Sequence, residues 1–321
     1  MNEFELIQQY FANLGRQRND VVVGIGDDAA VCSVADNHQL VVTTDLLVAG
    51  VHFPDETPAH AIGYKALAVN LSDLAAMAAT PAWFTMTLGL PETDKSWLQE
   101  FSRGLKELAD VSGITLIGGD TTRGPLTVGI QAYGFVANGS AVLRSGARVG
   151  DHIFVTGNLG DAALGLLGEI GKLELSADEQ KYFFQCLRYP IPCSQEGLAL
   201  NGVASAMIDV SDGLAADLGH ILEASGVGAS IQQSRLPISA HYKKLVGQVG
   251  TDAVLSGGDD YELCFTVPSA RIDNLQKLAA DWDCGVTEIG RIESAAGLRV
   301  IDEQGGLVDV VRPGYQHFSD Q

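Results

Sequence analysis

Short apolar runs alternate with longer segments of helical period along most of the chain, and this alternation restricts the fold more than any other feature. It is typical of α/β proteins, in which buried strands and covering helices follow one another. Residues 21–25 and 40–42 predict strands, and the almost continuously apolar segment 59–79 predicts a buried helix that ends at Thr80-Pro81. Further strands are expected at 115–117, 126–136, 152–156 and 261–267, helices at 97–111, 161–169 and 271–282, and a strand-to-helix unit around Asp209.

The composition changes between residues 137 and 151, where Ala-Asn-Gly-Ser is followed by Arg144-Ser145-Gly146-Ala147-Arg148 and Val149-Gly150-Asp151. Such a turn-rich stretch predicts a domain junction. With 321 residues, and about 150 residues per domain as a guide, two domains are expected. We place them at residues 1–137 and 148–321, in a mixed α/β (α+β) architecture.

The chain is strongly acidic, with 40 Asp and Glu against 20 Lys and Arg and a net charge of −20. Nucleic acids and anionic membranes need a basic surface, so neither is expected as a main partner. No apolar run approaches the ~20 residues that cross a bilayer, and the acidic start lacks the pattern of a signal peptide. The five cysteines contain no C-x-x-C pair, which predicts reduced core thiols in a cytoplasmic protein.

Several aspartates gather in glycine- or hydroxyl-rich clusters that we expect directly after strands or buried runs. Asp73 is the exception, since it lies within the predicted helix 59–79. Carboxylates at strand ends of an α/β sheet point into the crevice where ligands usually bind. The clusters are Gly24-Ile25-Gly26-Asp27-Asp28, Thr43-Thr44-Asp45, Gly118-Gly119-Asp120-Thr121-Thr122, Asp209-Val210-Ser211-Asp212-Gly213 and Gly257-Gly258-Asp259-Asp260.

The repetition of this cluster indicates a metal-dependent nucleotide site. One cluster alone would more often just satisfy local backbone N–H groups. Converging carboxylates, however, repel one another unless cations neutralise them, and an all-oxygen ligand set selects Mg²⁺. Such ions usually bridge phosphate oxygens, and the glycines would let backbone N–H groups reach the same anion.

Other catalytic templates are absent from the sequence. There is no G-x-x-x-x-G-K-[ST] loop for a P-loop enzyme, no EF-hand loop, no H-x-x-x-H pair for zinc and no G-x-S-x-G elbow.

At the acidic clusters the sequence closely resembles the thiamine-monophosphate kinase family. This family belongs to an ATP-binding superfamily that also includes aminoimidazole ribonucleotide synthetase and selenophosphate synthetase. The matching stretches run in family order through nearly the whole chain. They are G-I-G-D-D-A-A (24–30), T-T-D-L-L-V-A-G-V-H-F (43–53), Y-K-A-L-A-V-N-L-S-D-L-A-A-M (64–77), L-I-G-G-D-T-T-R-G-P-L (116–126), I-D-V-S-D-G-L (208–214) and S-G-G-D-D-Y-E-L-C-F-T-V (256–267).

The resemblance implies transfer of the γ-phosphoryl group of ATP to thiamine monophosphate, with several Mg²⁺ ions. It also implies a homodimer in which N-terminal-domain strands of both subunits form a shared β-barrel. The implied metal ligands are Asp28, Thr43, Thr44, Asp45, Asp73, Asp120, Asp209 and Asp212, of which Asp45, Asp120 and Asp212 are expected to be catalytic. The implied ATP contacts are Gly119, Asp120, Arg144 and Ser211, and the implied substrate contacts are His52, Glu262 and Tyr315. Asp259 departs from the family, in which Glu is frequent, but it keeps the charge.

Two other functions stay open. A synthetase of the same superfamily would share the acidic clusters, although the selenophosphate branch carries a reactive Cys or selenocysteine near a Lys in its N-terminal segment. This chain has no Cys before Cys32 and no Lys before Lys65. Outside enzymes, the acid-rich turns would suit a cation-binding protein.

Four of the predicted site residues also have an ordinary structural explanation. His52 could be a turn histidine, Arg144 a solvated charge, Glu262 an exposed strand residue and Tyr315 a packing residue.

Overall fold

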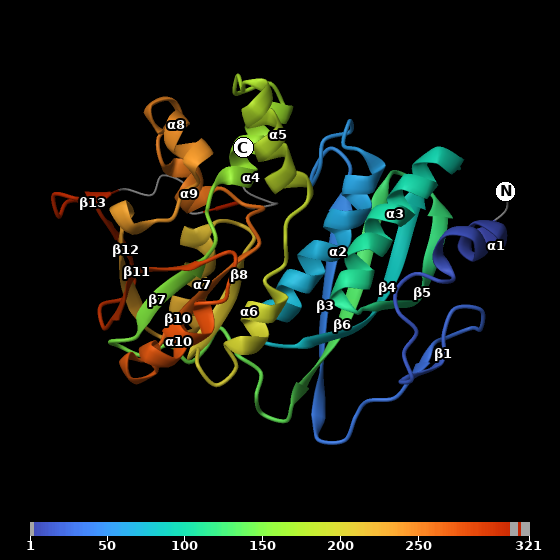
Figure 1. The fold of residues 1–321 in the computed structure, drawn as a ribbon, viewed down its shortest axis with the longest axis horizontal. Helices are drawn as coiled ribbons and strands as arrows, with labels where there is room; N and C mark the ends of the chain where they lie inside the picture. Colours follow the sequence, from blue (N-terminus) through green and yellow to red (C-terminus); the bar gives the residue numbers. More distant parts are fainter. Residues whose placement is uncertain (1–2, 309–313, 316–321) are drawn as a thin grey trace. The chain divides into compact units, whose positions relative to one another are not determined.

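The computed structural model describes residues 3–308 and 314–315, which form two compact units. Among the described residues, 3–74 and 79–139 belong to the first unit, and 75–78, 140–308 and 314–315 belong to the second. Figure 1 shows their elements in chain order. Among the described residues, no helix has both the length and the apolar character needed to cross a membrane.

The first unit is built on a four-stranded sheet in the order β3-β6-β4-β5. β6 pairs antiparallel with β3 and β4, whereas β4 and β5 are parallel, so β3 and β5 are the two edge strands. Its elements are α1 (Glu3–Leu6), the π-helical η1 (Ile7–Phe11), β1 (Val21–Val23), β2 (Val31–Cys32), β3 (His38–Val48), α2 (Ala59–Ala76), β4 (Thr80–Leu90), α3 (Lys95–Ser112), β5 (Thr115–Arg123) and β6 (Thr127–Ala137).

Helices α2 and α3 lie side by side over one face of this sheet (Figure 1). α2 is apolar nearly all round, and its leucines are fully buried. α3 is amphipathic and begins where the Asp94 carboxylate accepts the N–H groups of Ser96 and Trp97. The two backbones approach closely, because a Cβ on Gly104 would lie 2.0 Å from the carbonyl oxygen of His60. This contact positions α2, which carries Asp73.

The second unit contains a seven-stranded sheet in the order β13-β12-β9-β11-β7-β10-β8. All neighbours are antiparallel except β12 and β9. Its elements are β7 (His152–Thr156), α4 (Asp161–Glu169), α5 (Ala177–Arg188), α6 (Ser194–Ala199), β8 (Ala206–Val210), α7 (Leu214–Ser225), β9 (Gly228–Gln232), η2 (Gln233–Arg235), α8 (Ala240–Val249), α9 (Asp252–Ser256), β10 (Glu262–Val267), η3 (Ser269–Arg271), α10 (Ile272–Ala279), β11 (Val286–Glu293), β12 (Gly297–Ile301) and β13 (Leu307–Val308).

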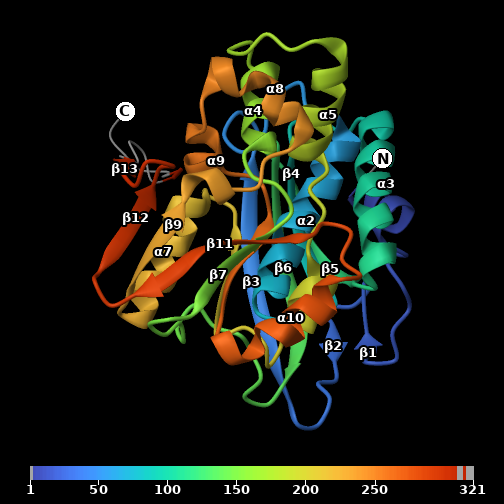
Figure 2. The ribbon, with the colours of Figure 1, turned by 60° about the vertical axis from the view of Figure 1, so that its left-hand side comes forward.

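Both faces of this larger sheet are buried, and alternate strand residues enter different cores. In β7, Ile153 and Val155 pack with α4, α5 and α7, whereas Phe154 packs with residues of α10. Figure 2 shows α7 running alongside β9 and β12. A sheet covered on both sides holds its strand ends rigidly, which suits it to support loops that bind a ligand.

Most of the predicted helices and strands are confirmed, with corrections at the acidic clusters. The clusters at 43–45 and 118–122 lie inside β3 and β5 and not after strands, because sheet pairing continues through their polar residues. The cluster at 257–260 follows α9 and precedes β10. Strand β4 was not predicted, since its Thr80-Pro81 start is typical of a helix end; here Pro81 is tolerated at a register shift.

The described residues form three sheets, with two, four and seven strands, and in the single chain none of them closes into a barrel. The expected dimeric barrel therefore stays a prediction.

Replacing Gly104 by alanine tests the close approach of α2 and α3. The added Cβ cannot fit 2.0 Å from a backbone oxygen, so the helices must separate, and we expect a loss of about 1–3 kcal/mol of unfolding free energy. Urea unfolding measures this loss. Gln99→Ala, at an exposed position of the same helix, is the control and should change stability by less than about 0.5 kcal/mol. Equal stability of the two variants would show that the close packing of α2 against α3 does not require glycine at position 104.

Candidate active site

In the first unit, one hydrogen bond joins two predicted metal ligands. The hydroxyl of Thr43 on β3 donates to the carboxylate of Asp73 on α2. Asp45 lies two residues further along β3 and therefore on the same face as Thr43. Thr44 is on the other face, where its hydroxyl donates to the carbonyl oxygen of Ile130 at 3.1 Å. The structure thus brings Thr43 and Asp73 together, beside Asp45, and separates Thr44 from them.

Gly119 and Asp120 lie on β5, the opposite edge of the sheet. Gly119 has φ +151°, and a Cβ there would lie 1.9 Å from the carbonyl oxygen of Met86, so no side chain fits. Asp120 is exposed. Two strands separate β5 from β3, and at about 4.8 Å per strand the two edges are about 14 Å apart. Within this unit, Asp120 and Asp45 are therefore not neighbours.

Asp28 lies in the loop after β1 and is exposed. Its backbone N–H donates to the carboxylate of Asp27 at 2.8 Å. This local bond shapes the turn and leaves the Asp28 side chain on the surface of the loop.

His52 lies in the turn after β3 and is half-buried. The N–H of Val48 donates to His52 Nδ1 at 3.0 Å, so in the neutral ring the proton is on Nε2. His52 therefore has a structural role in the turn, and this role is compatible with a substrate contact through Nε2.

In the second unit, three predicted residues lie at the end of β8 and in the turn that leads to α7. Asp209 is buried near the end of β8, and Ser211 and Asp212 follow it. Gly213 has φ +119°, and a Cβ there would lie 2.8 Å from the carbonyl carbon of Ser256. Glycine is therefore required at the point where the chain enters α7.

The carboxylate of Asp217, in the first turn of α7, organises this turn. One of its oxygens accepts the N–H groups of Ser211, Asp212 and Gly213, each at 3.1 Å. Burial, followed by the nearby charge of Asp212, raises the pKa of Asp217 to about 7. The expectation that backbone N–H groups of the glycine clusters reach the phosphate is thus wrong for this turn, because Asp217 already accepts them.

A second acidic loop packs on the first. The N–H of Asp259 donates to the carbonyl oxygen of Ser211 at 2.9 Å, and that of Tyr261 donates to Val210 at 2.8 Å. Asp259 and Tyr261 have φ values of +70° and +52°, which are strained for residues with side chains. These two backbone hydrogen bonds stabilise the strained conformation, and so does the Tyr261 hydroxyl, which donates to the carboxylate of Asp259.

Two further predicted residues flank the β8–α7 turn. The N–H of Tyr315 donates to the carbonyl oxygen of Asp212 at 3.1 Å, and its side chain is 49% exposed, so an aromatic face stands beside a predicted metal ligand. Arg144 is exposed in a segment that runs next to β8, where the carbonyl oxygen of Leu143 accepts the N–H of Met207. The backbone holds the segment, and the guanidinium extends from it.

Glu262 begins β10 opposite Val210. Its Oε2 accepts the hydroxyl of Thr156 at 2.5 Å and the thiol of Cys193 at 3.3 Å. Burial raises the pKa of Glu262 to about 7. The strand pattern of the sequence alone would make Glu262 an exposed residue, and this is not what the structure shows. Its own carboxylate ionises near neutrality.

Sequence reasoning did not predict the supporting role of two carboxylates in these loops. Asp217 is one, and its place in the first helical turn after a glycine loop is a signal that could have found it. Asp260 is the other: it accepts the N–H of Gly160 with both oxygens, at 3.0 and 2.8 Å, and burial raises its pKa well above the ordinary value. No local pattern indicates that distant partner.

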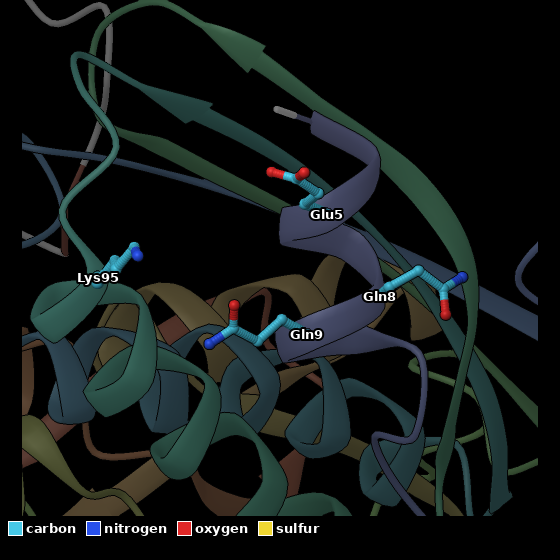
Figure 3. Close-up of a pocket in the computed structure, with 4 residues that line it drawn as sticks. All are labelled: Glu5, Gln8, Gln9 and Lys95. Carbon is cyan, nitrogen blue, oxygen red and sulfur yellow. The ribbon is translucent and has the colours of Figure 1, made fainter. Parts of the chain in front are cut away.

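The donor set is chemically suited to a hard cation, since it consists of carboxylate and hydroxyl oxygens. Within the described part of the chain, however, no three His, Cys, Asp or Glu side chains already gather as a metal site. An open hollow lies elsewhere, beside α1, η1 and the start of α3. It is lined by Glu5, Gln8, Gln9 and Lys95 (Figure 3), and it contains none of the predicted site residues.

Comparison with known proteins identifies the family. Residues 26–136 match the N-terminal domain and residues 148–303 the C-terminal domain of AIR synthase related proteins. Thiamine-monophosphate kinase of Salmonella typhimurium is 46% identical over 322 residues, covering 99% of this chain and 98% of that protein. The Escherichia coli K12 enzyme is 44% identical over 320 residues, with the same coverage. This chain belongs to the thiamine-monophosphate kinase family.

Solved structures of family members agree with the fold. The crystal structure of thiamine-monophosphate kinase from Stenotrophomonas maltophilia matches with a TM-score of 0.84 and 48% identity, over 91% of this chain and 93% of that one. AaThiL, complexed with AMPPCP and TMP, matches with a TM-score of 0.78 and 32% identity over 92% of each chain. The two-domain fold expected from the family resemblance is thus confirmed.

Substitution of Asp217 tests its role in the β8–α7 turn. Asp217→Ala removes the acceptor of three N–H groups, and we expect a loss of about 2–4 kcal/mol of unfolding free energy in urea. Asp217→Asn keeps a side-chain oxygen that can accept the same groups, so it should retain most of the stability. If alanine and asparagine were equally stable, the three hydrogen bonds would not hold the turn.

The raised pKa of Glu262 predicts a pH-dependent stability. Between the ordinary value of 4.5 and about 7, the folded state holds a proton that the unfolded state has lost, so stability falls as pH rises through this window. Glu262→Gln does not titrate. Its unfolding free energy relative to the native chain should therefore grow by about 3 kcal/mol between roughly pH 4 and pH 8.

Glu179→Gln is the control of opposite sign. Hydrogen bonds from Ser176 lower the pKa of Glu179, so this carboxylate contributes stability that is lost on acidification. Parallel stability profiles for Glu262→Gln and the native chain would contradict the assignment of Glu262.

Proposed function

We propose that this chain transfers the γ-phosphoryl group of ATP to thiamine monophosphate, which yields thiamine diphosphate and ADP. The observation that carries the proposal is the full-length match to thiamine-monophosphate kinases at 44–46% identity. The structure with AMPPCP and TMP shows that one family member binds an ATP analogue together with the phosphorylated acceptor.

Several Mg²⁺ ions are part of the proposal, and the donor set fits them. The side chains that would hold them are Asp28, Thr43, Asp45, Asp73, Asp120, Asp209 and Asp212, whereas the side chain of Thr44, which was also predicted as a ligand, points to the other face of β3. The hydrogen bond between Thr43 and Asp73 shows that two of these side chains already converge. When bound, Mg²⁺ neutralises phosphate charge and holds donor and acceptor in line.

The remaining predicted residues would bind the two substrates. The family resemblance alone assigns Gly119 to the nucleotide, since the space where its side chain would lie is filled by the backbone of Met86. Arg144 supplies an exposed guanidinium and Ser211 a hydroxyl for ATP. For thiamine monophosphate, Glu262 offers a carboxylate and Tyr315 an exposed ring, which suit a cationic aromatic group, and the family resemblance adds His52.

The proposed phosphoryl transfer needs little covalent catalysis by the side chains. The acceptor is a phosphate that is already anionic, so no general base is needed to activate it. The main barriers are repulsion between two anions and their alignment, which positioning and charge neutralisation lower. We therefore propose direct in-line transfer without a phosphorylated side chain, with Asp45, Asp120 and Asp212 as the carboxylates on which turnover depends.

We further propose that the chain acts as a homodimer through the four-stranded sheet. The sheet face that α2 and α3 do not cover exposes three apolar residues of β3: Leu40 at 42%, Val42 at 48% and Leu46 at 55%. A second copy that closed a barrel would cover this face. It would also give β3 and β5, which carry Asp45 and Asp120, new neighbours at both open edges.

A cytoplasmic location completes the proposal. All five cysteines are free thiols, although only Cys193 and Cys264 are buried and the other three are half-buried. Free thiols are usual in a reducing compartment, which is also where ATP is available.

An assay of ADP and thiamine diphosphate formation tests the function. The purified chain should convert ATP and thiamine monophosphate only when Mg²⁺ is present, and a chelator should abolish turnover. Asp45→Asn and Asp120→Asn should each lower kcat by roughly 10²–10³-fold, because each removes charge that holds the phosphates.

Asp110→Asn is the matched control, since Asp110 is an exposed carboxylate on α3 that pairs with Lys106. This variant should turn over at the native rate. Normal rates in both site variants would show that Asp45 and Asp120 are not essential ligands. Absence of Mg²⁺-dependent turnover with thiamine monophosphate would remove the kinase function and favour a related synthetase or a cation-binding role.

A further inference from the structure

Two cysteines of the second unit form a pair outside the predicted catalytic set. Cys193 is buried immediately before α6, and Cys284 is half-buried in the loop before β11. Although they are distant in the sequence, their thiols lie close enough to interact, and this interaction contributes to the raised pKa of Cys193. Cys264 is enclosed in the sheet core, and Cys32 lies in β2 of the first unit.

The surrounding structure holds this pair together from both sides. Cys193 Sγ is 3.5 Å from the hydroxyl of Thr156 at the end of β7. Val286, two residues after Cys284, pairs with the same Thr156 in the β7–β11 register. The Cys284 thiol also donates to Glu196 of α6 at 3.8 Å. Strand pairing and α6 thus bring the two cysteines to one place.

The pair connects directly to a predicted substrate residue. The Cys193 thiol donates to Glu262 Oε2 at 3.3 Å, and the same oxygen accepts the Thr156 hydroxyl. Any change in the bonding of Cys193 Sγ therefore alters the hydrogen bonds of Glu262.

We propose that Cys193 and Cys284 are a modification site, at which a low-molecular-weight disulfide oxidises them to a reversible intramolecular disulfide. The sulfur of Cys284 attacks the small disulfide, whose S–S bond breaks and releases one thiol that takes up the Cys284 proton. The sulfur of Cys193 then attacks Cys284 and releases the second small thiol. The Cys193 proton passes to Glu262 Oε2 and on to that leaving thiolate. Two protein thiols lose two electrons, and the small disulfide gains them.

The order of the two steps follows from exposure. Cys284 is half-buried and therefore the more exposed of the two, whereas Cys193 is buried. The neighbouring Cys284 thiol, together with burial, raises the pKa of Cys193 well above its ordinary value, which makes Cys193 a poor first nucleophile. Its reaction with Cys284 is intramolecular and is favoured by the existing contact.

Mass mapping of the full chain tests the site without any assay of activity. After incubation with oxidised glutathione and alkylation, we expect the count of free thiols to fall from five by two. A peptide that joins Cys193 to Cys284, lighter by two hydrogens, should appear, and dithiothreitol should reverse it. Cys284→Ser should abolish the cross-link, whereas the control Cys32→Ser should retain it. Five free thiols, a different cysteine pair, or glutathione that stays attached to Cys284 would overturn the proposal.

A kinetic measurement tests the connection to Glu262, and this part rests on the proposed function. The oxidised chain should show a KM for thiamine monophosphate raised about tenfold, because Glu262 loses one hydrogen-bond donor, while the KM for ATP is unchanged. Cys284→Ser should be insensitive to the oxidant. An unchanged KM in the cross-linked chain would overturn the connection. A chain without kinase activity would refute the proposed function, whereas the mass mapping would still decide whether the disulfide forms.

Discussion

The acidic loops keep their shape because peptide backbones approach one another more closely than any side chain would permit. A Cβ on Gly258 would lie 2.4 Å from the carbonyl oxygen of Ser211, and the contacts of Gly119 and Gly213 are equally restrictive. Part of the excess of glycine, 37 of 321 residues, is explained in this way. These approaches bring carboxylates into fixed turns, on which both the hydrogen-bond pattern and the proposed metal ligation depend.

Local periodicity predicted much of the fold, and it failed where pairing between distant segments decides the structure. The buried run of β7 and the helical period of α4 are visible in the sequence and are confirmed. β3 and β5 are longer than predicted because partner strands extend them through polar residues. β4 was missed because Thr80-Pro81 is typical of a helix end, whereas a register shift in the sheet accommodates the proline.

In the candidate site, too, features that depend on neighbouring residues were predictable and features that depend on distant segments were not. Asp209, Ser211 and Asp212 are neighbours in the sequence, and the turn between β8 and α7 keeps them together. The contact of Thr43 with Asp73 joins a strand to a helix, and only the resemblance to the family indicated that both belong to one site. The environment of Glu262 was not predictable, because Thr156 and Cys193 reach it from distant segments and burial raises its pKa.

The triple hydrogen bond to Asp217 has a consequence for nucleotide affinity. Backbone N–H groups next to the start of a helix often neutralise a bound phosphate, but those of Ser211, Asp212 and Gly213, just before α7, already donate to a protein carboxylate. With the proposed function, much of the positive charge that a phosphate needs would then come from dissolved cations. By thermodynamic linkage, the apparent dissociation constant for ATP would depend on the concentration of free Mg²⁺. Ligand binding by this chain would thus follow the ionic state of its surroundings as well as the supply of nucleotide.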